Sequence, residues 1–143
     1  MGLGRALVLS LLSGCLFAIG WCLFIDGVVS AAPGQYLWYF ASPAVLVTLS
    51  SILVNFIYAD QLLGGHNASP FGGSGDSDVI HARIWFYIMM TLSLCSVFGA
   101  LWIVLDHFAS PDPVVAWPGV ALQLQTVLVA ASGFCFFFGR RVT

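Results

Sequence analysis

Four long apolar runs take up most of this 143-residue sequence. They cover about residues 6–25, 36–58, 84–105 and 114–138, and each is close to the roughly 20 residues that a helix needs to cross the hydrocarbon core of a bilayer. Charged residues make up only 7% of the chain, too few to cover the surface of a soluble domain. The sequence therefore predicts an all-α integral membrane protein, with one transmembrane domain over residues 1–143.

The lengths of the connections predict how the spans are arranged. Segments of about ten residues follow the first and third runs, and such short connections place consecutive helices antiparallel. The middle connection, about residues 60–82, is rich in glycine, serine and aspartate, which is typical of a flexible solvated loop. We expect a four-helix bundle of two transmembrane hairpins, with both termini on the same side of the membrane.

The arginines indicate the orientation of this bundle. Arg5, Arg83, Arg140 and Arg141 all fall on the side that holds the termini and the middle loop, whereas the other two loops carry only aspartates and a histidine. By the positive-inside rule, the arginine side is cytosolic. The glycosylation pattern that begins at Asn67 would then face the cytosol, so we expect it to be unmodified.

The first run admits a second interpretation. A charged start, an apolar stretch and the small residues Val29-Ser30-Ala31 resemble a secretory signal with its cleavage site. The run is longer than the apolar core of a signal, which has about 7 to 15 residues. A retained first span is therefore the better prediction.

Small residues on the spans predict where helices approach closely. Lipid tails are as apolar as leucine, so helix association in a membrane depends on close packing and interhelical hydrogen bonds. Such contacts can serve the bundle itself or the helix of a partner protein. Small residues recur at four-residue intervals: Ser10, Gly14, Ala18 and Cys22 in the first span, Ser96 and Ala100, with Gly99 beside them, in the third, and Ala131, Cys135 and Gly139 in the fourth.

Polar residues within the spans need hydrogen-bond partners, because lipid offers none. Gln125 lies inside the fourth span, Gln123 lies about 200° around that helix from it, and Asn55 lies near the cytosolic end of the second span. Interhelical hydrogen bonds and a polar substrate path are both open interpretations, and the lack of an embedded charge favours the first. Asp26 closes the first span; if that helix continues to Val29, the carboxylate needs a partner.

No catalytic residue, cofactor, metal or nucleic-acid site is predicted. The sequence has no nucleophile beside a base, no CxxC pair, no phosphate loop and no basic run. Asp106 and His107 are adjacent, which by itself does not make a catalytic pair, and all four cysteines lie in apolar runs, which argues against a disulfide framework. The middle loop holds four potential ligands at a spacing that fits no compact metal site: His66, Asp76, Asp78 and His81.

Several short motifs carry a resemblance to a known family. They are Gly20-Trp21 and Ile25-Asp26 in the first span, Asn55 and Gln61 at the exit of the second, Ala82-Arg83-Ile84-Trp85 and Trp102-Ile103 in the third, and Pro118-Gly119-Val120-Ala121, Gln125 and Phe138-Gly139-Arg140 in the fourth. In these motifs the chain resembles the transmembrane protein 50 family over nearly its whole length. That family consists of small eukaryotic four-span proteins and includes the vacuolar protein sorting protein 68 type. Its members usually carry a polar segment ahead of the first span, where this sequence has five residues.

The resemblance implies a non-enzymatic protein of the endosomal and late secretory system. Such a protein would act as a sorting or scaffold factor by pairing with a second small multi-pass membrane protein. Two other functions stay open, an accessory subunit of a larger membrane complex and a small channel or transporter. The motifs, polar residues and small residues together predict a partner or bundle interface at Gly14, Ala18, Trp21, Asp26, Asn55, Arg83, Trp85, Gln125 and Arg140.

Overall fold

Four apolar helices packed as a bundle confirm the predicted all-α fold, and each is long and apolar enough to cross a membrane. The backbone is helical because hydrocarbon offers no partner for an unpaired amide or carbonyl group. The structure is a computed structural model that describes residues 2–36, 38–57 and 76–139. Its elements are α1 (Gly2–Ser30), the 3₁₀ turn η1 (Trp38–Ala41), α2 (Ser42–Leu53), the 3₁₀ turn η2 (Val54–Phe56), α4 (Asp76–His107) and α5 (Pro113–Gly139).

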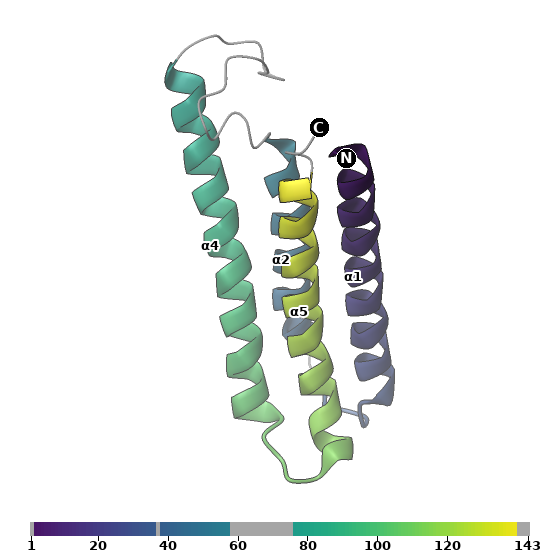
Figure 1. The fold of residues 1–143 in the computed structure, drawn as a ribbon. Coiled ribbons are helices and arrows are strands. Elements are labelled where there is room, and N and C mark those ends of the chain that lie inside the picture. Colours follow the sequence, from purple (N-terminus) through teal and green to yellow (C-terminus); the bar gives the residue numbers. More distant parts are fainter. Residues whose placement is uncertain (1, 37, 58–75, 140–143) are drawn as a thin grey trace.

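The helices alternate in direction, and the described ends nearest the two termini lie at the same end of the bundle (Figure 1). Helix α5 is the central element, because it contacts α1, α2 and α4. Helices α1 and α4 lie on opposite sides of it (Figure 1). The two hairpins therefore differ: α4 and α5 pack on each other, whereas α1 packs chiefly against α5 and makes few contacts with its sequence neighbour α2.

Two helices extend beyond the predicted spans. Helix α1 continues to Ser30, one turn past the expected end at residue 25. Helix α4 begins at Asp76, inside the segment predicted as a flexible loop, and the rest of that segment up to residue 75 lies outside the described residues. Helical hydrogen bonds can continue into the membrane interface, so the length of an apolar run gives only a minimum for the length of its helix.

Local hydrogen bonds position the helix ends opposite the termini. The Asp112 carboxylate accepts a hydrogen bond from the Val114 amide at 3.0 Å, and Pro113 occupies the first helical position of α5, where no amide hydrogen is needed. In the connection between α1 and η1, Gly34 has a φ of 79°, which favours glycine. The side-chain Nε2 of Gln35, in this connection, donates to the Val115 carbonyl at 2.8 Å and so links the first hairpin to α5.

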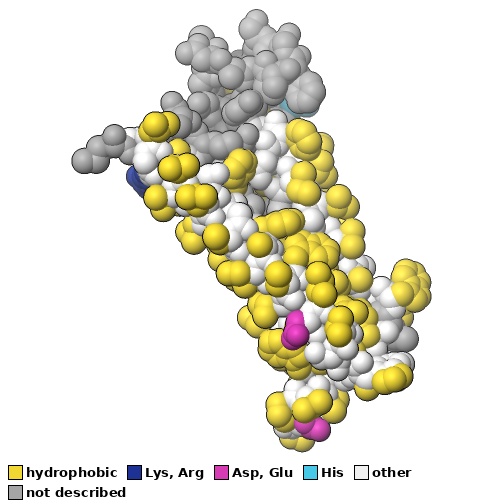
Figure 2. Space-filling view, turned by 90° about the vertical axis from the view of Figure 1, so that its right-hand side faces the viewer, with side chains coloured by type: hydrophobic (Ala, Val, Ile, Leu, Met, Phe, Trp, Pro, Cys, Tyr) yellow, Lys and Arg dark blue, Asp and Glu magenta, His cyan; other side chains and the backbone are white. Residues whose placement is uncertain are grey.

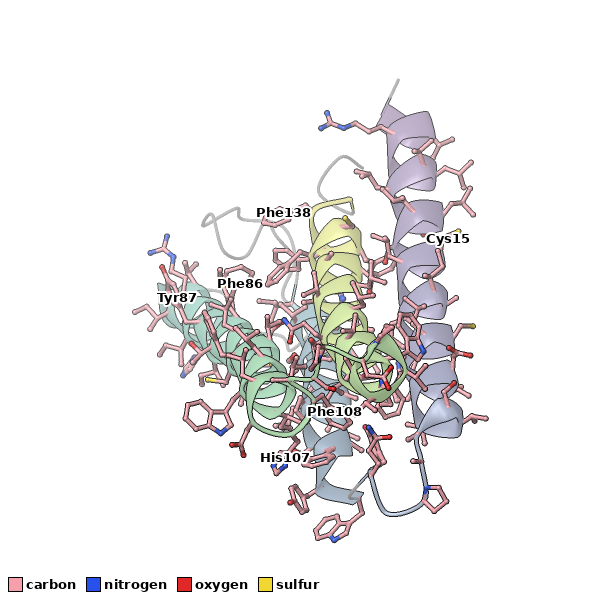
Figure 3. The ribbon with its side chains drawn as sticks, turned by 90° about the horizontal axis from the view of Figure 1, so that it is seen from below. Cys15, Phe86, Tyr87, His107, Phe108 and Phe138 are labelled. Carbon is pink, nitrogen blue, oxygen red and sulfur yellow. The ribbon has the colours of Figure 1, made fainter. Side chains whose placement is uncertain are left out.

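Two apolar clusters form the core between α2, α4 and α5. The cluster nearer the termini is built around Val54, Met89 and Phe137, and the cluster at the opposite end is built around Ala44, Ala100 and Leu122. Phe108, labelled in Figure 3, is buried beside Gly119, where a Cβ would lie only 2.6 Å from the Phe108 Cβ. The Pro118-Gly119 motif of the sequence therefore makes room for an aromatic ring.

Candidate functional site

The interface between α1 and α5 is the most extensive helix contact of the bundle, and we call it the α1–α5 seam. Its buried α1 residues, Ser13, Gly20 and Gly27, stand seven positions apart. The same spacing occurs on α5, where buried Pro118, Gln125, Ser132 and Gly139 face the seam. A seven-residue period in both helices is the pattern that keeps one face of each helix against the other along its length.

Glycine sets the close approach in the seam. A Cβ added to Gly27 would lie 2.6 Å from the Cβ of Ala121, and one added to Gly139 would lie 2.9 Å from the Cβ of Leu9. At Gly20 the Val129 side chain lies 3.2 Å from the same position. Larger side chains at these positions would push the two helices apart, which is the role of small residues in membrane helix packing.

Serine hydroxyl groups link α5 both to α1, across the seam, and to α2. Ser13 on α1 donates to the Ser132 carbonyl on α5 at 2.8 Å. Ser51 on α2 donates to the Val129 carbonyl on α5 at 3.1 Å, and it fits because α5 has Gly133 at that point. Each of these bonds satisfies a hydroxyl inside the apolar part of the bundle.

Asp26 has the partner that the sequence required for a longer first helix. Because α1 runs to Ser30, Asp26 lies within the helix, and its Oδ2 accepts a hydrogen bond from Trp117 Nε1 on α5 at 2.8 Å. Arg5 and Asp26 are 21 positions apart on α1, or about 31 Å at 1.5 Å per residue. This separation matches the hydrocarbon thickness, so the bond belongs at the membrane interface opposite the termini.

Gln125 on α5 is fully buried, and its backbone carbonyl oxygen lies 3.4 Å from the Cβ position of Gly20 on α1. Among the described residues, neither its Oε1 nor its Nε2 has a hydrogen-bond partner. The prediction of interhelical hydrogen bonds was made for Gln125, Gln123 and Asn55. Asn55 Nδ2 donates a hydrogen bond at 2.7 Å to the carbonyl of Ser51, four residues earlier in the chain, so this bond does not link two helices. Gln123 Oε1 is buried without a partner among the described residues.

The stripe of small residues predicted on the first span lies on the outer surface of α1, away from the seam. Ser10, Gly14, Ala18 and Cys22 are all exposed, and a Cβ at Gly14 would have open space around it. Cys15 also points away from the other helices (Figure 3). In Figure 2, which views this side of the molecule, hydrophobic side chains lie between basic atoms toward one end and acidic atoms toward the other. This outer face of α1, centred on Gly14, Ala18 and Cys22, is exposed in the part of the chain that the structure describes.

The remaining predicted interface residues occupy different places. Trp85 on α4 donates from Nε1 to the Leu53 carbonyl at 2.9 Å, so it fixes the end of α2 that lies nearest the termini. Trp21 is half-buried on α1 and stacks edge-on against Phe24, with ring centroids 5.4 Å apart. Arg83 is exposed near the start of α4. Arg140 lies outside the described residues.

The polar groups outside the seam form no recognisable catalytic arrangement within the described part of the chain. The exposed side chains of Asp106 and His107 lie 3.2 Å apart, from Oδ2 to Nε2, and the His107 ring packs on Phe40. The described residues contain no cluster of three or more metal-ligating side chains. His66 and Asn67 lie outside the described residues, as do the side chains of Asp76 and Asp78; His81 is exposed.

Tyr36, in the connection between α1 and η1, has a buried hydroxyl without a partner among the described residues. Burial raises the pKa of Tyr36 to about 12, because the phenolate would be poorly solvated there. The ring packs edge-on between Phe24 and Phe40. Tyr36 thus belongs to an aromatic cluster at the end of the bundle opposite the termini.

Several residues that position the seam were not predicted from the sequence. Trp117 is the partner of Asp26, and Gln35 links the first connection to α5. A tryptophan at the same membrane depth as an interfacial carboxylate was an available signal for the first of these. The seven-residue spacing of Ser13, Gly20 and Gly27 was an available signal for the face of α1 that is buried.

Comparisons with known proteins give one family and a distant relative. Residues 3–143 match the uncharacterised protein family UPF0220. A protein described as "Transmembrane protein 50 homolog" from Dictyostelium discoideum is 29% identical over 139 residues, which cover 89% of this chain and 85% of that protein. No solved structure gives a significant match. The predicted resemblance to the transmembrane protein 50 family is confirmed by these matches.

Proposed function

This chain belongs to the UPF0220 family, and on that basis we propose that it is a non-enzymatic sorting or scaffold factor that pairs with another membrane protein. The chain is an integral membrane protein with four spans. We place it in the endosomal and late secretory membranes, as the resemblance to the transmembrane protein 50 family implies. We place its termini in the cytosol, because Arg5 and Arg83 lie at the end of the bundle that holds the termini.

The observation that carries the proposal is the outer face of α1. This helix buries the smallest share of its apolar window among the four spans, 11% against 44% for α5. Its outer face presents Gly14, Ala18 and Cys22 at four-residue intervals, a spacing that lets a second helix approach closely in a membrane. The small residues in the seam serve the same purpose within the chain, so the bundle already uses this kind of contact once.

The distribution of charge supports a pairing function over transport. All described Asp and Arg side chains lie near the helix ends, at the membrane interfaces. Transport paths for ions or protons usually place an ionisable side chain deep in a span. A small channel remains the third candidate, and flux of ions through liposomes that contain the purified protein, above that of empty vesicles, would support it.

An accessory subunit of a larger membrane complex is the second candidate. The observation that favours it is the exposure of large side chains on α4, on the side of the bundle away from α1: Tyr87, Phe98 and Trp102 are 66%, 66% and 73% exposed. Exposed surfaces on α1 and on α4 would allow larger subunits to contact the protein on two opposite sides. Loss of the protein would then lower the assembly of that complex and leave general sorting intact.

Capture of the tagged protein in mild detergent, followed by mass spectrometry, tests these alternatives. The proposal predicts one dominant small multi-pass membrane protein, whose recovery falls when Ala18 is replaced by isoleucine. Recovery of a set of large-complex subunits would favour the second candidate. Recovery of no membrane protein that depends on Ala18 would contradict pairing through α1.

A further inference from the structure

A small cavity lies between α2, α4 and α5, and each of these helices contributes to its wall. It encloses about 190 Å³ of space between its atoms, including its open part, and the centre of a water molecule fits in only a small fraction of that space. The cavity therefore admits about one water molecule. Its wall is mostly apolar, with side chains such as Met89 and Phe134, but it also includes Ser50, Ser51 and Ser93.

The cavity lies near the middle of the membrane. On α4, Ser93 comes ten positions after Arg83 and 13 positions before Asp106, which is about 15 Å and 20 Å along the helix at 1.5 Å per residue. The two charged residues stand at the ends of the span, so Ser93 is far from the aqueous phase on either side. A hydroxyl group at this depth must find its hydrogen-bond partner inside the bundle.

Ser93 differs from the other hydroxyl residues in the same part of α4. Thr91 and Ser96 each donate a hydrogen bond at 2.8 Å to the carbonyl four residues earlier in the helix. The Ser93 side chain is only 5% exposed, and its hydroxyl makes no hydrogen bond to any of the described residues. A buried hydroxyl that lines a cavity and lacks a protein partner is the kind of group that internal water satisfies.

The two serines of α2 in the wall complement the free donor of Ser93. Ser50 donates to the Val47 carbonyl at 3.0 Å, and Ser51 donates to the Val129 carbonyl at 3.1 Å. Each of these hydroxyls has used its only hydrogen, and its oxygen can still accept a hydrogen bond. The wall thus combines one free donor with two acceptors, and a molecule that both accepts and donates hydrogen bonds matches this set.

We propose that this cavity is a binding site for one water molecule, which accepts a hydrogen bond from Ser93 on α4 and donates to the serine oxygens of α2. An ion does not suit the site, because no charged side chain lines it. The water would join α4 to α2 in the middle of the membrane, whereas Trp85 joins α4 to the Leu53 carbonyl nearer to the termini. The inference goes beyond the proposed pairing function and does not depend on it.

Nuclear magnetic resonance detects such a water directly. The full chain, labelled with nitrogen-15 and placed in perdeuterated detergent micelles, is measured for magnetisation transfer from water to backbone amides. We expect cross-peaks of opposite sign in NOE and ROE spectra at the Ser93 amide and none at the Ser96 amide. Ser96 is the control, because its hydroxyl is buried on the same helix and does not line the cavity. Equal cross-peaks at both amides would indicate hydroxyl exchange alone, and this result would overturn the proposal, as would no cross-peak at Ser93.

The stability of two serine variants gives an independent readout. Ser93→Ala removes a hydrogen bond to the water and should raise the equilibrium constant for unfolding in micelles about 3- to 30-fold, the range that one hydrogen bond gives between membrane helices. Ser96→Ala removes only a bond to a carbonyl of its own helix and should change this constant little. In a dry cavity the Ser93 hydroxyl would be unpaired, so its removal would be neutral or stabilising. Either of those results for Ser93→Ala, or an equal loss in Ser96→Ala, would contradict the water site.

Discussion

Asp26 on α1 and Trp117 on α5 are joined by a 2.8 Å hydrogen bond from the indole Nε1 to the carboxylate Oδ2. The bond lies at the end of the bundle opposite the termini, at the depth where an interfacial tryptophan and a carboxylate can both reach water. It joins the end of α1 to α5, the helix against which α1 chiefly packs. The sequence predicted a carboxylate at this end of the first span, and the structure shows that it accepts a hydrogen bond from α5.

A double-mutant cycle measures this bond. Asp26→Ala and Trp117→Phe should each lower the free energy of unfolding, and the coupling between them should be about 0.5 to 1.5 kcal/mol, the usual net value of one hydrogen bond. Asp26→Asn should lose less, because its amide oxygen still accepts the bond. Reversible unfolding in mixed micelles gives the three values. Additive effects of the two single changes would show that the bond contributes no stability.

Two glycines of α1 provide a matched test of the seam. Gly27→Ala should destabilise the protein by about 1 to 3 kcal/mol, because the new Cβ would meet the Ala121 Cβ at 2.6 Å and the helices must separate. Gly14→Ala faces open space and should be neutral or stabilising by up to about 1 kcal/mol, since alanine favours a helix. The same unfolding measurement compares them. Equal effects would contradict the assignment of the two faces.

The sequence did not reveal which face of α1 is buried in the bundle. The four spans and the common end of the termini follow from apolar length and connection length, and the structure confirms this bundle. The stripe through Gly14 and Ala18, predicted to contact either the bundle or a partner's helix, faces outward, whereas the stripe through Gly20 and Gly27 is buried. In a membrane both faces of a helix can be apolar, so hydrophobic contrast does not reveal which one is inside.

The tryptophan of α4 that bonds to α2 should contribute to stability. Trp85→Phe removes the donor to the Leu53 carbonyl and should cost about 1 kcal/mol of unfolding free energy. Trp102 is 73% exposed on the same helix, and the structure shows no hydrogen bond for it among the described residues. Trp102→Phe is therefore the control with the same chemical change and should have little effect. A loss that is as large in the control would point to ring size instead of the hydrogen bond.

The dependence of the melting temperature on alkaline pH tests the burial of Tyr36. Its pKa is raised to about 12 in the folded protein, above the value near 10 of an unfolded chain. Between these values the folded chain keeps the phenol proton and the unfolded chain loses it, so the melting temperature should fall as the pH rises from about 10 to 12. Tyr36→Phe should reduce this fall, whereas Tyr39→Phe, at an exposed ring, should retain it. An unchanged fall in Tyr36→Phe would contradict the burial.

The sequence predicted individual residues of the candidate site, but it did not predict which groups they contact. Asp26, Trp85 and Gln125 were expected at interfaces because polar or amphipathic groups in a span need partners. The structure gives Asp26 and Trp85 their partners, Trp117 and the Leu53 carbonyl, and leaves Gln125 without one among the described residues. Which group meets which depends on the rotation and register of α1 against α5, and these follow from the packing of both helices together.

The most direct test of the central claim, pairing through the outer face of α1, is quantitative capture of the dominant membrane partner by the wild type and two variants, all at equal expression. Gly14→Ile combined with Ala18→Ile should lower recovery at least about tenfold, because branched side chains prevent the close approach of a second helix. Cys95→Ile, which adds similar bulk to an exposed position on α4, should match the wild type. Undiminished recovery with the α1 variant, at an unchanged melting temperature, would contradict the account.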